Sequence, residues 1–320
     1  MSIQLTQLLG IQYPIIVAPM FLISNEEMVI NALESGVTAA FPALNYRTIK
    51  ELDQVISTIK SKTNKPFGVN LIVNKSNPKY KEQLNLIAEK EVDFIITSLG
   101  NPKEVIECCK NIKTKVFCDV TDLHYAQKVE GLGADALIAV SSEAGGHAGS
   151  IPRNKLIETL TNNCKIPVIC AGGIATGTQL HEAIQLGASG ASIGTIFLAS
   201  EEAPISKEYQ QALIKYGKND IVLSSKLSGS PLTVINTPYV QEIGTKASFL
   251  ERLMNRNKWL KKYLKLIIAV RGMNKVRKAA FSATYKTVWC AGPSIEYIKE
   301  IRPIKHILKD LIDQYELAKS

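Results

Sequence analysis

The sequence lacks several patterns that would assign the chain to a common class. Its six cysteines include no C-x-x-C pair, which argues against a zinc site and a disulfide framework. No stretch reaches the ~18 uninterrupted apolar residues of a membrane-spanning helix, and the first residues have no features of a secretory signal. No G-x-G-x-x-G motif follows the first apolar run, so a separate dinucleotide-binding domain is not supported. These absences predict a cytoplasmic protein with no metal site and no integral membrane segment.

Positive charge is concentrated in one part of the chain. The net charge is +9, yet residues 245–287 alone contain twelve Lys or Arg and one acid, Glu251. Outside that segment the chain is therefore weakly acidic. The segment has the composition of a solvated helical face or of a surface that attracts an anionic partner or a membrane surface. No nucleic-acid-binding motif accompanies it, so we expect no nucleic acid partner.

Eight short apolar runs recur between residues 15 and 195. They are rich in β-branched or small residues, and segments with helical spacing separate them. Uniformly apolar strands that alternate with amphipathic helices predict a parallel sheet covered by helices. Eight units fit a closed (β/α)8 barrel, the TIM barrel, better than an open doubly wound sheet. The runs span residues 15–20, 37–44, 67–73, 93–99, 115–120, 134–140, 166–173 and 188–195.

The pattern changes after the eighth run. We expect residues 1–200 and 286–320 to form the barrel, and residues 201–285 to form a helical, basic insertion. Residues 249–281 have the pattern of two or more amphipathic helices, and a final helix over about 294–318 would return to the barrel wall. Active sites of this fold lie at the carboxyl ends of the strands. An insertion that leaves the eighth strand is thus placed to act as a lid.

Glycines follow the seventh and eighth runs. The seventh ends in Ala171-Gly172-Gly173, and the eighth ends in Ser192-Ile193-Gly194-Thr195. Glycine lets the backbone approach a ligand closely, and consecutive N–H groups can point at an anion. The loops after strands seven and eight are the usual phosphate site of this fold. The alternative is that these glycines only relieve crowding at the barrel rim.

A histidine lies in the glycine-rich loop after the sixth run, which reads SEAGGHAG over residues 142–149. His147 would face the catalytic end of the barrel, and its ordinary pKa of about 6.5 suits proton transfer near neutrality. The alternative is a histidine that merely caps a turn. The other three histidines fall in predicted outer helices, where we expect surface or packing roles: His124, His181 and His306.

These residues resemble the nitronate monooxygenase family, which includes similar flavin-type enoyl-acyl-carrier-protein reductases. The resemblance is carried by APM (18–20), GVN (68–70), SEAGGHAG (142–149), AGGI (171–174), GTIFLAS (194–200) and VWCAG (288–292). It implies FMN held non-covalently in the barrel mouth, with His147 facing the substrate as the catalytic residue. It also implies a set of cofactor-binding residues: Ala18, Met20, Asn70, Gly145, Gly173, Ser192, Ile193, Gly194 and Thr195. Two positions depart from the family, which often has glutamine where this chain has Val140 and Pro293.

The resemblance implies oxidation of a small molecule, an alkyl nitronate, by O2 to a carbonyl compound and nitrite. One alternative is an NAD(P)H-dependent flavin reductase of an enoyl thioester or a quinone. A basic surface would suit an acidic acyl-carrier protein or the phosphates of the nicotinamide cofactor. A third is a flavin-free barrel that binds a phosphorylated metabolite or docks a protein. A homodimer is one alternative for the assembly.

Overall fold

The computed structural model describes residues 3–74, 77–224, 232–245 and 288–320. Eight parallel strands close into a barrel in the order β1-β2-β3-β4-β5-β6-β8-β9, and each coincides with one of the eight predicted runs. Their bounds are β1 Ile15–Val17, β2 Thr38–Pro42, β3 Gly68–Ile72, β4 Phe94–Ser98, β5 Lys115–Val120, β6 Ala136–Val140, β8 Val168–Ala171 and β9 Gly190–Ile193. The barrel is closed by pairing between β1 and β9, with Ile16 opposite Ser192. The predicted TIM barrel is confirmed.

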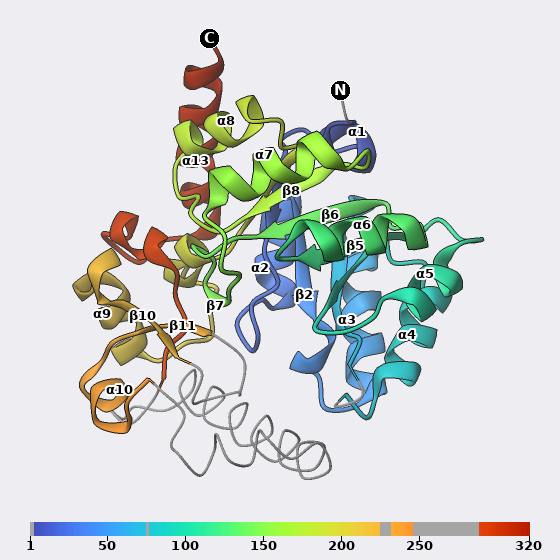
Figure 1. Ribbon diagram of the computed structural model, residues 1–320. Helices are drawn as coiled ribbons and strands as arrows, with labels where there is room; N and C mark the ends of the chain where they lie inside the picture. The colour runs from blue at the N-terminus through green and yellow to red at the C-terminus, as the bar shows by residue number, and fades with distance from the viewer. Residues whose placement is uncertain (1–2, 75–76, 225–231, 246–287) are drawn as a thin grey trace, which may run out of the picture.

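Helices surround the barrel between successive strands (Figure 1). Several begin at the side-chain caps that their sequences predict. Thr48 and Glu51 form a capping box at the start of α3, and Asp122 accepts a hydrogen bond from Tyr125 N at the start of α6. Gly133 ends α6 with a left-handed φ of 97°. The helices of this part are α2 Glu26–Glu34, α3 Ile49–Lys62, α4 Tyr80–Glu89, α5 Lys103–Cys109, α6 Leu123–Leu132, α7 Arg153–Asn163 and α8 Gly177–Gln185.

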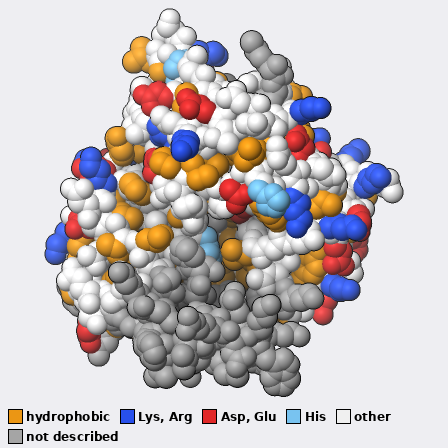
Figure 2. Space-filling view, in the orientation of Figure 1, with side chains coloured by type: hydrophobic (Ala, Val, Ile, Leu, Met, Phe, Trp, Pro, Cys, Tyr) orange, Lys and Arg blue, Asp and Glu red, His pale blue; other side chains and the backbone are white. Residues whose placement is uncertain are grey.

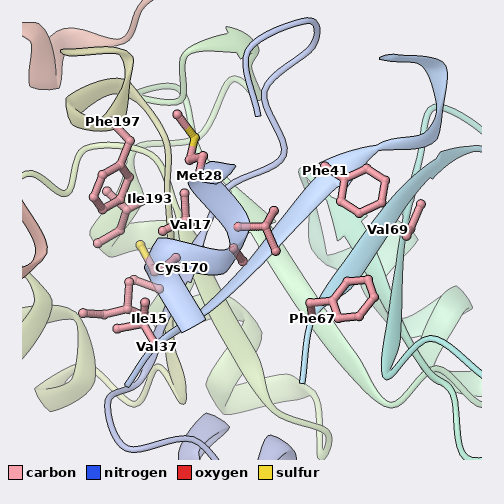
Figure 3. Packing of buried hydrophobic residues seen from close by; sticks show 14 of the residues in the cluster. Ile15, Val17, Met28, Val37, Phe41, Phe67, Val69, Cys170, Ile193 and Phe197 are labelled. Atoms are coloured by element: carbon pink, nitrogen blue, oxygen red, sulfur yellow. The ribbon is translucent and has the colours of Figure 1, made fainter. Parts of the chain in front are cut away.

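Two buried apolar layers hold the barrel together. One layer fills the barrel interior, where Phe94 and Phe117 stack with their ring centroids 4.9 Å apart. Leu5 of α1 (Leu5–Leu9) joins this layer, so α1 closes the amino-terminal end of the barrel. The second layer lies between strands and helices. Figure 3 shows part of it, including Phe41 and Phe67, whose rings stack 6.3 Å apart. The open end of the barrel is thus the end at which the strands finish.

A small antiparallel sheet lies beside the barrel, in the order β10-β11-β7. Its strands are β7 Gly146–His147, β10 Ile221–Ser224 and β11 Leu232–Ile235. In Figure 1 this sheet lies at the end of the barrel opposite α1. We expected a helical insertion over residues 201–285, and the structure shows the strands β10 and β11 there beside helical elements. The described helical elements here are α9 Lys207–Lys215, the short 3-10 helix Lys218–Asp220 and α10 Pro238–Ile243. Residues 249–281, the predicted basic helices, lie outside the described residues.

The carboxyl-terminal helix begins later than predicted. Residues Pro293–Tyr297 form a 3-10 helix, and α13 spans Ile304–Lys319. Pro303 precedes α13 as its N-cap residue, because its fixed φ suits a helix start and its missing N–H cannot continue one. The helix packs against α8 and α2, so it does return to the barrel wall. Within the described ranges, no helix combines the length and apolar character needed to cross a membrane.

Candidate active site

The predicted site residues come together at the carboxyl ends of the strands, which we call the mouth. Asn70 lies in β3, Ser192 and Ile193 finish β9, and Ala18 directly follows β1. The backbone N–H of Ala18 donates to the carbonyl of Ile193 (2.8 Å), which joins the ends of these two strands. A Cβ added at Gly194 would lie 3.5 Å from Ala18 Cβ and 3.7 Å from Met20 Sδ. The residues predicted for the phosphate therefore adjoin those predicted for the flavin ring.

The loop after β1 is held in place by its own side chains. Ser24 Oγ donates to the Ala18 carbonyl (3.0 Å) and accepts from the backbone N–H of Met20 (2.8 Å). Asn45 Oδ1 accepts from the N–H of Leu22 (2.7 Å), a residue with a left-handed φ of 61°. These bonds fix Ala18 and Met20 at the mouth before any ligand binds.

The loop that contains His147 is held by the insertion. His147 and Gly146 form β7, where they pair with Leu232 and Thr233 of β11. The buried hydroxyl of Thr233 lies 2.6 Å from the Ala144 carbonyl and 3.3 Å from the Gly146 carbonyl. Thr233 is a residue that sequence reasoning missed, because its partners lie almost ninety residues away in the chain. The insertion therefore holds the loop that contains His147 as well as flanking it.

His147 has the surroundings of a neutral base. Its side chain is exposed to solvent, yet nearby protein atoms displace enough water to lower the pKa of the imidazole below its ordinary value. Desolvation acts in this direction because it disfavours the charged imidazolium. A lowered pKa leaves the ring uncharged at neutral pH, so it can accept a proton or donate one N–H.

The loop after β8 makes the sharp turn that its glycines predict. Gly172 and Gly173 have left-handed φ values of 104° and 75°, and successive N–H groups in such a turn can face an anion. The structure also gives these glycines a packing role, since a Cβ at Gly173 would lie 2.1 Å from Glu143 Oε2. Glu143 Oε1 in turn accepts from the N–H of Arg153 (3.1 Å), and the guanidinium of Arg153 donates to the Gly173 carbonyl (2.7 Å).

Thr195 lies where three segments of the mouth meet. A Cβ added at Gly145 would be 3.0 Å from both Thr195 Oγ1 and Gly292 N, so close packing favours glycine there. Thr195 Oγ1 accepts from Gly292 N (3.0 Å), which leaves the hydroxyl proton for another acceptor. Residues Thr195–Ala199 form a short 3-10 helix. Small residues, a tight glycine turn and a hydroxyl proton together form a cradle that fits a phosphate.

Replacing Thr195 tests this cradle. We expect Thr195→Val to weaken FMN binding about 10-fold, because one hydrogen bond to the phosphate is lost and Gly292 N loses its acceptor. Thr195→Ser is the matched control, since it keeps the hydroxyl. FMN dissociation constants for the three proteins check the prediction. Equal affinities for the valine and serine variants would contradict the phosphate assignment.

A polar side-chain network crosses three strands inside the mouth. Asn70, which is 7% exposed, donates from Nδ2 to Ser98 Oγ (2.7 Å), and Ser98 donates to Asp119 Oδ2. Sequence reasoning selected Asn70 but missed Ser98 and Asp119. A sequence signal was present, because each is a polar residue at or near the carboxyl end of its strand.

Residues 288–292, near the carboxyl terminus of the chain, lie against the mouth beside Gly145 and Thr195. Trp289 stacks on Tyr209 of α9 (5.3 Å between centroids), and Tyr209 donates to the Cys290 carbonyl (2.6 Å). The carbonyl of Trp289 accepts from the N–H of Ile235, at the end of β11. The barrel and the described part of the insertion are thus joined at the mouth.

Charge is spread over the described surface. Figure 2 shows side chains of both signs distributed across one face, which is hollowed near its centre. The concentrated positive charge of residues 246–287 lies outside the described residues.

Comparison with known proteins identifies the family. The family model for nitronate monooxygenase matches residues 2–314. A probable nitronate monooxygenase of Staphylococcus haemolyticus is 31% identical, with 74% of this chain and 79% of the relative aligned. A relative from Rhodococcus jostii, a 5-hydroxy-7a-methyl-1-oxo-octahydro-1H-indene-4-carboxyl-CoA dehydrogenase, is 29% identical, with 75% of this chain and 67% of that protein aligned.

Solved structures support the same grouping. FabK from Thermotoga maritima superposes with a TM-score of 0.84 at 29% identity, covering 98% of this chain and 96% of FabK. A nitroalkane oxidase from Streptomyces ansochromogenes shares the fold, with a TM-score of 0.79, 23% identity and 98% of each chain covered. The chain belongs to the nitronate monooxygenase family and is an FMN-dependent oxidoreductase.

Proposed function

We propose that this protein is a nitronate monooxygenase, which oxidises alkyl nitronates with O2 to carbonyl compounds and nitrite. The observation that carries the proposal is the placement of His147. A loop pinned by β11 holds it at the same mouth as the glycine turn and Asn70. The 31% identity to a probable nitronate monooxygenase supports the same substrate class.

The residues of the mouth have separate tasks in this proposal. FMN supplies the redox chemistry when it is bound. Ser192, Ile193, Gly194 and Thr195 would hold its phosphate, together with the glycine turn at Gly173. Ala18 and Met20 would pack beside the ring, Asn70 would hydrogen-bond to it, and Gly145 and Gly173 would let the cofactor approach the backbone.

His147 acts on the substrate. Because its pKa is lowered, the neutral imidazole can remove the proton next to the nitro group of a neutral nitroalkane. With a nitronate already formed, the same ring can donate its N–H to a nitro oxygen and orient the anion. Neither task requires contact with the FMN phosphate.

An anaerobic absorbance titration of the FMN-loaded protein tests the proposal. We expect ethyl nitronate alone to change the flavin absorbance, and NADH or NADPH alone to leave it unchanged. Readmitting O2 should restore the spectrum and release nitrite. Bleaching by the nicotinamide, with no response to the nitronate, would contradict the monooxygenase assignment.

The second candidate is an NAD(P)H-dependent reductase of an enoyl thioester or quinone. It is favoured by the close superposition on FabK and by the relative whose name contains a CoA thioester. The same titration separates the two, because this candidate requires reduction by NADH or NADPH. A protein with no flavin spectrum would contradict both and favour the flavin-free barrel.

A further inference from the structure

The polar network of the mouth contains a carboxyl group that the proposed chemistry does not use. Asp119 lies on β5, next to Ser98 on β4, and Asn70 lies on β3 beyond it. Phe117, two residues before Asp119 on the same face of β5, belongs to the apolar layer that fills the barrel. Asp119 therefore faces the barrel interior at the mouth, where it is half-buried.

The hydrogen-bond directions along this network are fixed by its chemistry. An ionised carboxylate can only accept, so Ser98 must give its single proton to Asp119. Ser98 can then only accept from its other neighbour, which requires Asn70 to present its amide nitrogen. The Nδ2 group of Asn70 donates to Ser98 Oγ (2.7 Å) and to the Ile96 carbonyl (3.1 Å), so both of its protons have acceptors. Any side-chain hydrogen bond that Asn70 offers a ligand is therefore made as an acceptor, through Oδ1.

We propose that Asp119 is a positioning residue that acts through Ser98 to fix the carboxamide of Asn70, so that the mouth offers a hydrogen-bond acceptor to the flavin. The proposal rests on the placement of FMN given above. The polar edge of the oxidised flavin ring carries one N–H between two carbonyl groups. When Oδ1 of Asn70 faces the ring, it can accept a hydrogen bond from the flavin N–H. A flipped amide would instead offer its nitrogen to the flavin carbonyl groups.

The same network responds to pH. Burial raises the pKa of Asp119 from 3.8 to about 6, and the hydrogen bond from Ser98 partly opposes this rise. Below that pH the carboxyl group carries its own proton and can donate to Ser98, which then competes with Asn70 for the serine oxygen. Above about pH 6 the carboxylate thus adds to the direction that the Ile96 carbonyl also imposes on Asn70, and below that pH this addition is lost.

The titratable side chains next to Asp119 do not account for a change in hydrogen bonding near pH 6. Among the described residues, Tyr125 of α6 and Cys118 of β5 have pKa values that respond to the charge of Asp119. Burial is the largest cause at both: it raises the pKa of Tyr125 above its ordinary value, and it raises the pKa of Cys118 to about 12. Both groups are therefore uncharged around pH 6.

Dissociation of FMN from the loaded protein, followed by flavin fluorescence between pH 5 and 8, tests the proposal. We expect wild-type dissociation to quicken roughly 10-fold as the pH falls through about 6, the change of about one hydrogen bond. Asp119→Asn keeps an acceptor for Ser98 but cannot titrate, so its FMN dissociation should depend less on pH than that of wild type; only the FMN phosphate, with a second pKa of about 6, should still contribute. The Ser98→Ala protein should release FMN quickly at every pH between 5 and 8.

Thr97→Val is the matched control for Ser98→Ala. Thr97 is the preceding residue on β4 and belongs to the opposite face, where its hydroxyl approaches the Phe117 carbonyl (3.4 Å). This variant should keep the wild-type pH profile, which excludes a general effect of altering β4. The proposal is overturned if Asp119→Asn keeps the wild-type pH dependence, or if Ser98→Ala retains FMN as wild type does. A wild-type protein that binds no FMN would overturn the proposal together with the cofactor assignment.

Discussion

His147→Ala is expected to retain FMN and to lose turnover by on the order of 10²–10⁴-fold, the usual contribution of a positioned general acid or base. FMN should stay bound because His147 lies on the β7 loop, apart from the proposed phosphate cradle at the ends of β8 and β9. The backbone pairing with Leu232 does not require the imidazole, so the loop should keep its place. Steady-state kinetics with a neutral nitroalkane, together with the flavin spectrum, measure both expectations.

His124→Ala is the matched control, since His124 lies on the outer helix α6 and should be dispensable. The wild-type pH profile of kcat/KM adds a second readout. Because desolvation by nearby protein atoms lowers the pKa of His147, the neutral base persists to lower pH than for an ordinary histidine. Activity should therefore fall only as the pH drops below the ordinary histidine value of about 6.5. Full activity of His147→Ala would remove His147 from the mechanism.

Gly172→Ala is expected to lower the free energy of unfolding by roughly 3 kcal/mol and to cause loss of FMN. A φ of 104° is strained for alanine, at a cost of roughly 1–3 kcal/mol. The new Cβ would also lie 2.5 Å from Ala144 N and 2.6 Å from Ser141 Oγ, and this overpacking costs a further ~1–3 kcal/mol. The collision involves the backbone of the catalytic loop, which must shift away from β8. Urea unfolding and FMN content measure the two effects.

The Gly10→Ala variant separates the cost of backbone strain from the cost of the steric clash. Gly10 also has a left-handed φ, 68°, but a Cβ there would meet nothing within 4 Å. Gly10 ends α1 at the closed end of the barrel. The free energy of unfolding of Gly10→Ala should therefore fall by only about 1 kcal/mol, and FMN should stay bound. Equal losses in the two variants would show that contact with the catalytic loop contributes nothing.

The barrel could be predicted because each of its strands has a local signal. Runs such as 67–73 and 93–99 are mostly apolar, and Gly133 follows α6 where its helical pattern ends. The mouth could be predicted for the same reason, since His147 and Gly173 lie in the glycine-rich segments that follow β6 and β8. Positions that depend on local sequence could therefore be predicted.

The small sheet and the polar network depend on contacts between distant parts of the chain. β7 has two residues, Gly146 and His147, and becomes a strand only because β11 pairs with it. Asp119 and Ser98 meet through the register of β4 and β5, where Thr97 pairs with Cys118. No local propensity encodes such pairings. The roles of the site residues toward FMN remain predictions for the experiments above.

A crystal structure of the FMN-loaded protein tests most directly whether one mouth holds both the cofactor and His147. We expect the phosphate against Gly173 and the Ser192–Thr195 turn, the flavin ring beside Asn70, and His147 facing the ring across the substrate space. FMN bound elsewhere, or bound with its phosphate beside His147, would contradict this arrangement.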